Sequence, residues 1–196
     1  MAENMDPYLE STPVVDWTHP RVKAKAGQLA DGCKDDVEKA RWVYEWTRDE
    51  IKHSSDFALN PVTCSASEVL EYGTGYCFAK AHLMVAMLRA NGIPAGFCYQ
   101  RLRTDGPDPA FGLHGYGAAY LPGFGWYRLD PRGNRPGLTA RFSPQDEQLA
   151  FAANQEGEWN DPKIRPEPLP LVVAALRRHL TWDQFLKNLP DAADPA

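Results

Sequence analysis

The chain has 196 residues and carries 21 lysines and arginines against 26 aspartates and glutamates, a formal net charge of −5. This length predicts a single domain with its own hydrophobic core, and the acidic balance disfavours nucleic acid as a partner. The composition, 43% hydrophobic and 24% charged residues, excludes a largely disordered or collagen-like chain. No apolar run approaches the ~18 residues of a membrane-spanning helix, and the first residues show no secretory signal. We therefore expect a cytoplasmic protein that binds no membrane.

The first half of the chain has the spacing of apolar residues that is typical of helices. After an extended arm over residues 1–19, Pro20 suits the first turn of a helix. Ser65 and Glu68 have the spacing of a capping box, which begins a later helix. Asn91 and Gly92 are typical of a helix end. Together these signals predict four helices, at about 20–30, 35–52, 65–72 and 76–90.

The second half changes to the pattern of strands. Three strands are predicted, at 97–102, 114–121 and 126–130. A loop over 103–112 and a turn over 122–125 connect them. Seven prolines in 131–170 predict irregular chain wrapped over the domain, and apolar spacing predicts one closing helix over 171–189. Helices followed by an antiparallel meander predict the α+β class. We expect one domain over 1–196, with its core at about 35–135, an N-terminal arm and helix at 1–34, and the wrap and C-terminal helix at 136–196.

Cys77 differs from the other three cysteines by its position. It lies in the first turn of a predicted helix, directly after Gly73-Thr74-Gly75. Free backbone N–H groups and the positive helix end stabilise a thiolate there, and the thiolate is the nucleophilic form. A plain structural role is the alternative. Buried, unreactive positions are expected for the others, Cys33, Cys64 and Cys98, and their spacing supports neither a disulfide nor a metal site.

A nucleophilic thiol needs a base, usually histidine, and the histidine needs an orienting group. His82 lies five residues after Cys77 on the same helix and points about 140° away, which excludes it as the base. A hairpin turn centred on Gly123 makes His114 and Asp130 diagonal neighbours on one face of the sheet. The hairpin is therefore predicted to present an imidazole and its orienting carboxylate together. The alternative is that His114 and Asp130 are neighbours on the surface and have no catalytic role.

Several stretches, in this order and spacing, resemble the transglutaminase-like superfamily: Ala66–Leu70, Gly73–Cys77, Leu88–Ala95, His114 and Gly125–Pro131. The resemblance covers roughly residues 35–135 and implies a papain-like fold with a triad of Cys77, His114 and Asp130. It also implies amide-bond cleavage or exchange through a thioester. His114-Gly115-Tyr116 departs from the His-x-Trp of many members. The chain also lacks the β-domains and calcium sites of the animal cross-linking enzymes, which argues against calcium dependence and cross-linking.

Acyl transfer also needs hydrogen-bond donors for the oxyanion of the tetrahedral intermediate. The backbone N–H of Cys77 is one expected donor. The side-chain donor remains open among four residues, Trp42, Trp46, Gln100 and His53.

Other residues near these motifs have two readings each. His53 and Asp56 could bind substrate, or His53 could simply favour the end of a helix. Tyr76 and Tyr116 could line a cleft or belong to the core. The arginines that follow, Arg128, Arg132, Arg135 and Arg141, are expected to be solvated loop residues rather than an anion site, and Arg132 fits either a turn or an anion-binding loop.

The leading hypothesis is a cysteine-dependent amide-bond hydrolase of the protease, amidase or deamidase type. It would act on a peptide, protein or small amide through a thioester at Cys77. An acyltransferase or transamidase with the same triad is the first alternative, and a non-catalytic peptide-binding module is the second. No metal and no organic cofactor are expected, because no phosphate-binding glycine loop occurs in a parallel βαβ context.

Overall fold

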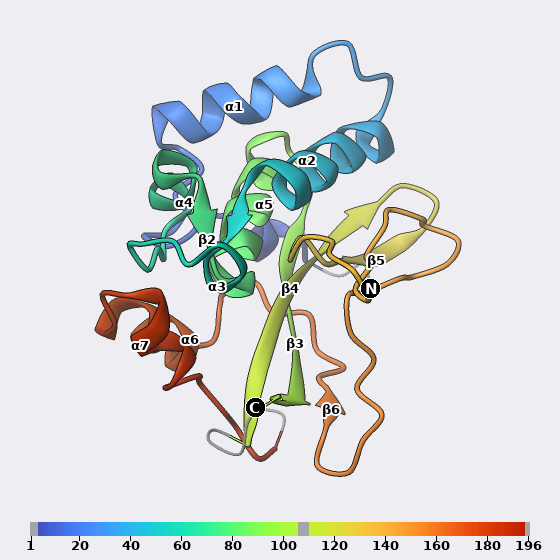
Figure 1. Cartoon of the computed structure of the whole chain (residues 1–196). Helices are drawn as coiled ribbons and strands as arrows, with labels where there is room; N and C mark the ends of the chain where they lie inside the picture. The colour runs from blue at the N-terminus through green and yellow to red at the C-terminus, as the bar shows by residue number, and fades with distance from the viewer. Residues whose placement is uncertain (1–3, 106–109, 195–196) are drawn as a thin grey trace.

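The computed structural model describes residues 4–105 and 110–194, and its helices occupy both ends of the chain. The helical elements are η1 (Asp6–Tyr8), α1 (Pro20–Ala30), α2 (Asp36–Glu50), α3 (Ser54–Phe57), α4 (Ala66–Tyr72), α5 (Cys77–Ala90), α6 (Pro170–Arg178) and α7 (Trp182–Leu186). The strands are β1 (Lys52–His53), β2 (Thr74–Gly75), β3 (Ala95–Arg103), β4 (Phe111–Leu121), β5 (Gly125–Leu129) and β6 (Trp159–Asn160). The molecule is therefore α+β, with helices before an antiparallel sheet, as predicted (Figure 1).

The long helices begin at the cap residues that the sequence indicated. Pro20 occupies the first turn of α1, and the Asp35 side chain accepts a hydrogen bond from the Glu38 backbone at the start of α2. Ser65 and Glu68 form both hydrogen bonds of a capping box at the start of α4. The predicted helix positions in the first half of the chain are confirmed to within two residues.

The main sheet has the order β5-β4-β3-β6 and is antiparallel throughout. In the hairpin of β4 and β5, Gly117 pairs with Leu129 and Ala118 with Arg128. This is the register predicted from a turn centred on Gly123. Continued by one residue, it brings Asp130 opposite Tyr116 and diagonal to His114.

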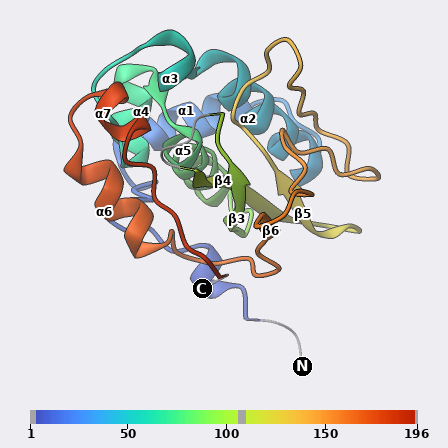
Figure 2. The same cartoon turned by 60° about the horizontal axis from the view of Figure 1, so that its bottom comes forward.

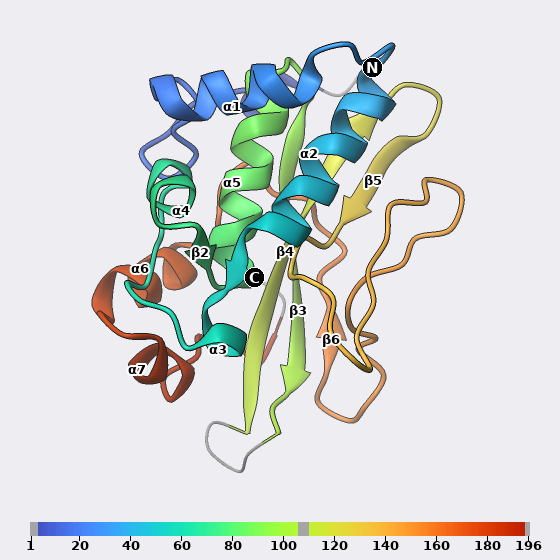
Figure 3. The same cartoon turned by 45° about the horizontal axis from the view of Figure 1, so that its top comes forward.

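Helix α5 is the centre of the core, and every residue from Cys77 to Arg89 is buried. It packs against β4, and Figure 3 shows α4 and α2 on either side of it with α1 crossing one end. The other face of the sheet carries a smaller apolar cluster, formed by Cys98, Tyr116 and Ala118 under Leu149 and Ile164. The later part of the wrap, which contains Leu149 and Ile164 and is drawn in orange in Figure 2, therefore covers the sheet face opposite α5. Its earlier part lies beside α2, where Phe142 packs near Tyr44.

Three predictions about the chain ends are corrected by the structure. The single helix over 171–189 is wrong, because His179 and Thr181 adopt extended backbone and separate α6 from α7. The Thr181 hydroxyl donates to the Asp183 side chain at 2.7 Å, and α7 begins at the residue between them, Trp182. The wrap is mostly irregular but contributes β6 to the edge of β3, and the N-terminal arm contains η1.

The loop between β3 and β4 is shorter than the predicted 103–112, because β3 extends to Arg103 and β4 begins at Phe111. Residues 106–109 of that expected loop lie outside the described residues. The short elements β1, α3 and β2 were not predicted. Each of them is two to four residues long and has no periodicity to detect.

Two glycines of β4 allow α5 to lie against the strand, and one of them gives a direct test. A Cβ on Gly115 would lie 2.4 Å from Phe78 Cδ1, so Gly115→Ala is expected to destabilise the protein by about 1–3 kcal/mol through overpacking. Gly27→Ala in α1 is the matched control, since its Cβ meets nothing within 4 Å, and should stabilise by about 0.5–1 kcal/mol. Denaturant unfolding measures both. Equal effects would contradict the close approach of α5 and β4.

Candidate active site

Cys77 is the first residue of α5, and the turn before it holds it in place. Gly73 ends α4 in the left-handed conformation (φ 65°), and His53 of β1 pairs in parallel with Gly75 of β2. The chain then turns directly into α5, whose first backbone N–H groups have no partner within the helix. Cys77 is 7% exposed. The thiol therefore sits at the positive end of a buried helix, as the sequence indicated.

His114 and Asp130 meet in the hairpin. His114 Nε2 and Asp130 Oδ2 are 2.8 Å apart, and Asp130 also accepts backbone hydrogen bonds from Arg132 (3.1 Å) and Ala150 (3.0 Å). Burial alone would raise the pKa of Asp130, but His114 and these donors lower it. The carboxylate is therefore ionised and fixed in orientation.

The same imidazole also contacts Cys77. Burial lowers the pKa of His114, but the charges of Asp130 and Cys77 and hydrogen bonds to both raise it to about 10. Because Nε2 faces Asp130, Nδ1 is the nitrogen left for the thiol. The structure thus pairs His114 with Asp130 and places Cys77 near enough to the imidazole to raise its pKa, so that an imidazolium is stable at neutral pH.

The covering of this group comes from the wrap. The Phe151 ring lies edge-on to the His114 ring at 4.9 Å between centroids, and Tyr116 stacks on it at 5.7 Å. As a result His114 is only 5% exposed. The role of Phe151 was not visible in the sequence, because the segment around it has no periodic pattern.

A second charged group lies beside the first. Arg132 donates to both carboxylate oxygens of Asp56 at 2.6 and 2.9 Å, and its side chain is 7% exposed. The expectation of a solvated loop arginine is therefore wrong for Arg132. Burial would raise the pKa of Asp56, but the hydrogen bonds from Arg132 lower it. Among its neighbours, Arg128 lies 3.8 Å from Glu147, and Arg141 lies 3.5 Å from Asp146.

His53 does not lie at the C-terminal end of a helix, since α2 ends at Glu50 and His53 belongs to β1 and directly precedes α3. Its ring lies 5.4 Å from the Tyr76 ring, and Nδ1 is 3.0 Å from the Ser55 hydroxyl. Burial and then the charge of Arg132 lower the pKa of His53 well below its usual value. His53 is therefore neutral, and Nδ1 is the ring nitrogen that contacts Ser55.

Lys80 is a buried cation that the sequence reasoning missed. Its ammonium donates to the backbone oxygens of Arg48 (3.1 Å) and Ile51 at the end of α2. Burial lowers its pKa to about 7. It joins the helix that carries Cys77 to the chain that leads into His53. A charged residue within the first turns of a wholly buried helix was the available signal.

The remaining predicted residues have other partners. The Tyr76 hydroxyl donates to the Trp182 carbonyl, and its ring packs on Phe185 at 4.3 Å, so Tyr76 belongs to the core. Gln100 lies opposite His114 on β3. Its amide nitrogen already donates to the Phe151 carbonyl and to Asn160, so it is not available to an oxyanion. Of the two tryptophans considered as oxyanion donors, Trp42 is 50% exposed and Trp46 packs under Lys25.

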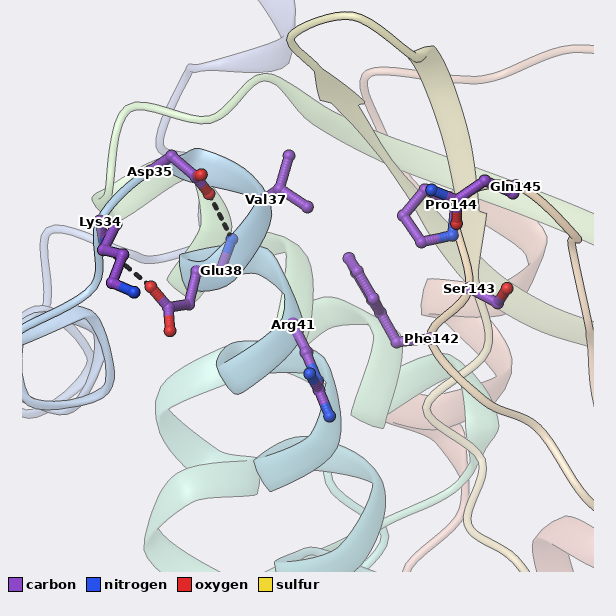
Figure 4. Close-up of a pocket in the computed structure, with 9 residues that line it drawn as sticks. All are labelled: Lys34, Asp35, Val37, Glu38, Arg41, Phe142, Ser143, Pro144 and Gln145. Carbon is purple, nitrogen blue, oxygen red and sulfur yellow. Dashed lines mark hydrogen bonds between the residues drawn. The ribbon is translucent and has the colours of Figure 1, made fainter.

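A separate hollow of about 440 Å³ lies between the start of α2 and the segment 142–145. Figure 4 shows two hydrogen bonds among its lining residues, with Asp35 accepting from the Glu38 backbone and Glu38 from the Lys34 backbone. None of the predicted site residues lines it. Within the described residues, no group of three metal-binding side chains is placed to hold an ion. None of their helices has both the length and the apolar character to cross a membrane.

Comparison with known proteins shows which family the chain resembles and which solved structures share its fold. Residues 23–131 match the model of the transglutaminase-like superfamily. No curated protein matches the chain. A solved structure described as a "putative cysteine protease" from Cytophaga hutchinsonii superposes with a TM-score of 0.56 at 20% identity, covering 67% of this chain and 43% of that one. The periplasmic domain of TgpA from Pseudomonas aeruginosa bound to ethylmercury gives a TM-score of 0.47 at 20% identity, covering 63% and 46%. The chain spans less than half the length of both, and the likeness to the first concerns the fold alone.

Proposed function

Because the chain belongs to the transglutaminase-like superfamily, we propose that it is a cysteine-dependent hydrolase of amide bonds in a peptide, protein or small amide. The observation that carries the proposal is the position of one imidazole between a thiol at a helix N-terminus and an ionised, orientated carboxylate. A nucleophile, a base and an orienting group in this order are what acyl transfer requires.

The proposed reaction has two halves. The Cys77 thiolate attacks the amide carbonyl, and the tetrahedral intermediate expels an amine that takes its proton from His114. A thioester on Cys77 remains. Water then gives a proton to His114 and attacks the thioester, which releases a carboxylic acid and restores the thiolate and the imidazolium. Asp130 holds the ring so that Nδ1 faces the sulfur throughout.

Two donors are proposed for the oxyanion. The first is the backbone N–H of Cys77, which is free at the start of α5. The second is His53, since the other three candidates are exposed, packed elsewhere or already bonded. His53 pairs with Gly75, two residues before Cys77. We propose that Nδ1 of the neutral ring accepts from the Ser55 hydroxyl, which is 3.0 Å away, because this tautomer carries the proton on Nε2 and can donate it to the oxyanion.

His53→Phe is expected to lower kcat about a hundredfold, the usual cost of one oxyanion donor. Phenylalanine retains the ring contact with Tyr76 but removes the donor. His53→Gln restores an N–H group and should recover part of the rate, whereas a purely structural role would make Gln the worse replacement. Steady-state kinetics and thermal unfolding of both variants decide between these outcomes.

The proposal as a whole is tested by an acyl-enzyme. The protein is mixed with a library of amide and glutamine peptides and a labelled amine, then quenched in acid and examined by mass spectrometry. We expect a peptide acyl group on Cys77 and release of amine or ammonia, and neither with Cys77→Ala. A peptide-binding module would retain peptide without any covalent adduct, and that result would overturn the proposal.

Acyl transfer to an amine is the second candidate. The observation that favours it is the low exposure of Cys77 (7%) and His114 (5%), because a site that excludes water protects a thioester from hydrolysis. The labelled amine in the same experiment separates the two. Incorporation of label in excess of free acid indicates a transferase, and free acid alone indicates a hydrolase.

A further inference from the structure

A cavity of about 740 Å³ lies between the sheet and the wrap. Its sheet side is formed by Gln100 of β3, Tyr116 of β4 and Arg128 of β5. These residues point to the face opposite α5, because even-numbered positions of β4 alternate with Gly115 and Gly117, which contact α5. Segments 147–153 and 160–162 of the wrap close the other side.

The cavity adjoins the triad. Two of its lining residues, Tyr116 and Phe151, are the same two rings that contact the His114 imidazole, at 5.7 and 4.9 Å between centroids. A molecule in the cavity that contacts either ring is therefore separated from the His114 imidazole by that ring. Its position suits a part of a substrate that extends beyond the reacting bond.

The charge in the cavity is incompletely paired. Arg128 has a side chain 32% exposed, and its nearest carboxylate in the described residues, Glu147, is 3.8 Å away and 39% exposed. Arg128 Nε is enclosed without a hydrogen-bond partner among the described residues, and so is Gln100 Oε1. Gln100 is 1% exposed, and its amide nitrogen is held by Phe151 and Asn160. A buried donor and a buried acceptor without partners are costly, so the empty cavity leaves interactions that a ligand would complete.

The chemistry of these groups defines the ligand. A guanidinium pairs best with a carboxylate, through two parallel hydrogen bonds, and an amide oxygen accepts from a peptide N–H. We propose that the cavity binds an acidic residue of a peptide, with its carboxylate on Arg128 in place of Glu147 and a peptide N–H directed to Gln100. That this peptide is a substrate rests on the proposed function; the binding site itself does not.

Binding is tested on Cys77→Ala protein, which removes any turnover. The probes are N-acetyl-glutamate amide and N-acetyl-glutamine amide, which have the same shape and differ in charge, and calorimetry measures their affinities. The glutamate probe is expected to bind about tenfold more tightly, and Arg128→Met should abolish that preference. Arg141→Met is the matched control, because it removes a positive charge outside the cavity, and should change the affinity less than about twofold.

A variant that binds more tightly than the unaltered site provides a second test, because misfolding cannot explain a gain of affinity. Glu147→Gln removes the competing carboxylate and is expected to strengthen binding of the glutamate probe. Equal affinities of the two probes, or an Arg128→Met variant that folds and keeps the preference, would overturn the proposal. Acyl-enzyme on Cys77 together with such a result leaves the proposed function standing and removes the cavity site. If the probe binds in an Arg128-dependent way but the protein with Cys77 intact forms no acyl-enzyme, the cavity site is supported and the proposed enzymatic function is rejected.

Discussion

Iodoacetamide at pH 6 is expected to alkylate Cys77 more than about a hundredfold faster than Cys33, and more than about 10⁴-fold faster than Cys64 or Cys98. Burial lowers the pKa of His114, but Asp130 and Cys77 raise it to about 10, so the imidazole is a cation at pH 6. We propose that this cation beside the sulfur activates Cys77. Burial raises the pKa of Cys64 to about 11 and that of Cys98 to about 12. At pH 6 those thiols are almost entirely protonated.

The rates are measured for each cysteine by peptide mass spectrometry over a time course. His114→Gln is the control, since it removes the charge beside the sulfur and should reduce the Cys77 rate to about that of Cys33. If Cys77 in the unaltered protein reacts no faster than Cys33, the thiol is not activated, and the nucleophile must be abandoned. If His114→Gln leaves the rate high, the activation comes from the helix end alone.

Asp130→Asn is expected to reduce kcat about 10³–10⁴-fold with little change in KM. The carboxylate accepts from His114 Nε2 at 2.8 Å, which leaves Nδ1 to exchange a proton with Cys77. Oδ1 of Asp130 accepts from the Arg132 backbone, and Oδ2 faces both His114 and the Ala150 backbone N–H. An asparagine that keeps its oxygen on the Arg132 donor places its amino group at the Oδ2 position, where it faces His114 and leaves the Ala150 N–H without an acceptor. That arrangement favours the tautomer with the proton on Nδ1, which cannot accept a proton from the thiol.

Asp191→Asn is the matched control for this variant. Asp191 is also a carboxylate held by two hydrogen bonds, here from Arg101 at 2.7 Å each, but it belongs to the C-terminal chain outside the site. It should retain full activity. A loss for Asp130→Asn that is confined to KM, or that follows unfolding at the assay temperature, would refute an orienting role. Thermal unfolding curves of both variants provide that check.

The local features of the fold were predictable from the sequence. Helix positions follow from apolar spacing and caps such as Ser65, and the hairpin register follows from the turn at Gly123. Because a register fixes which side chains are neighbours, the approach of His114 to Asp130 followed as well. These features depend on contacts within a few residues, where sequence patterns carry the most information.

Contacts between distant segments were not predictable in the same way. The pairing of Arg132 with Asp56 joins residues 76 positions apart, and nothing near Arg132 distinguishes it from a surface arginine. Phe151 covers His114 from a segment without periodicity. The split between α6 and α7 depends on Thr181, whose signal as a helix start is weaker than the apolar spacing that continues across it. In each case the local sequence was compatible with two structures, and packing between distant segments decided between them.

The groups around the imidazole come from two stretches of chain. Cys77, His114 and Asp130 lie within the family-matching residues 23–131, whereas the Ala150 donor and the Phe151 ring lie outside them. In the proposed enzyme, the residues that react and the residues that cover them are thus encoded in separate stretches of the chain. Grafting a different sequence over 147–162 offers a route to new selectivity that leaves the reacting atoms untouched, provided that the graft supplies a backbone N–H to Asp130.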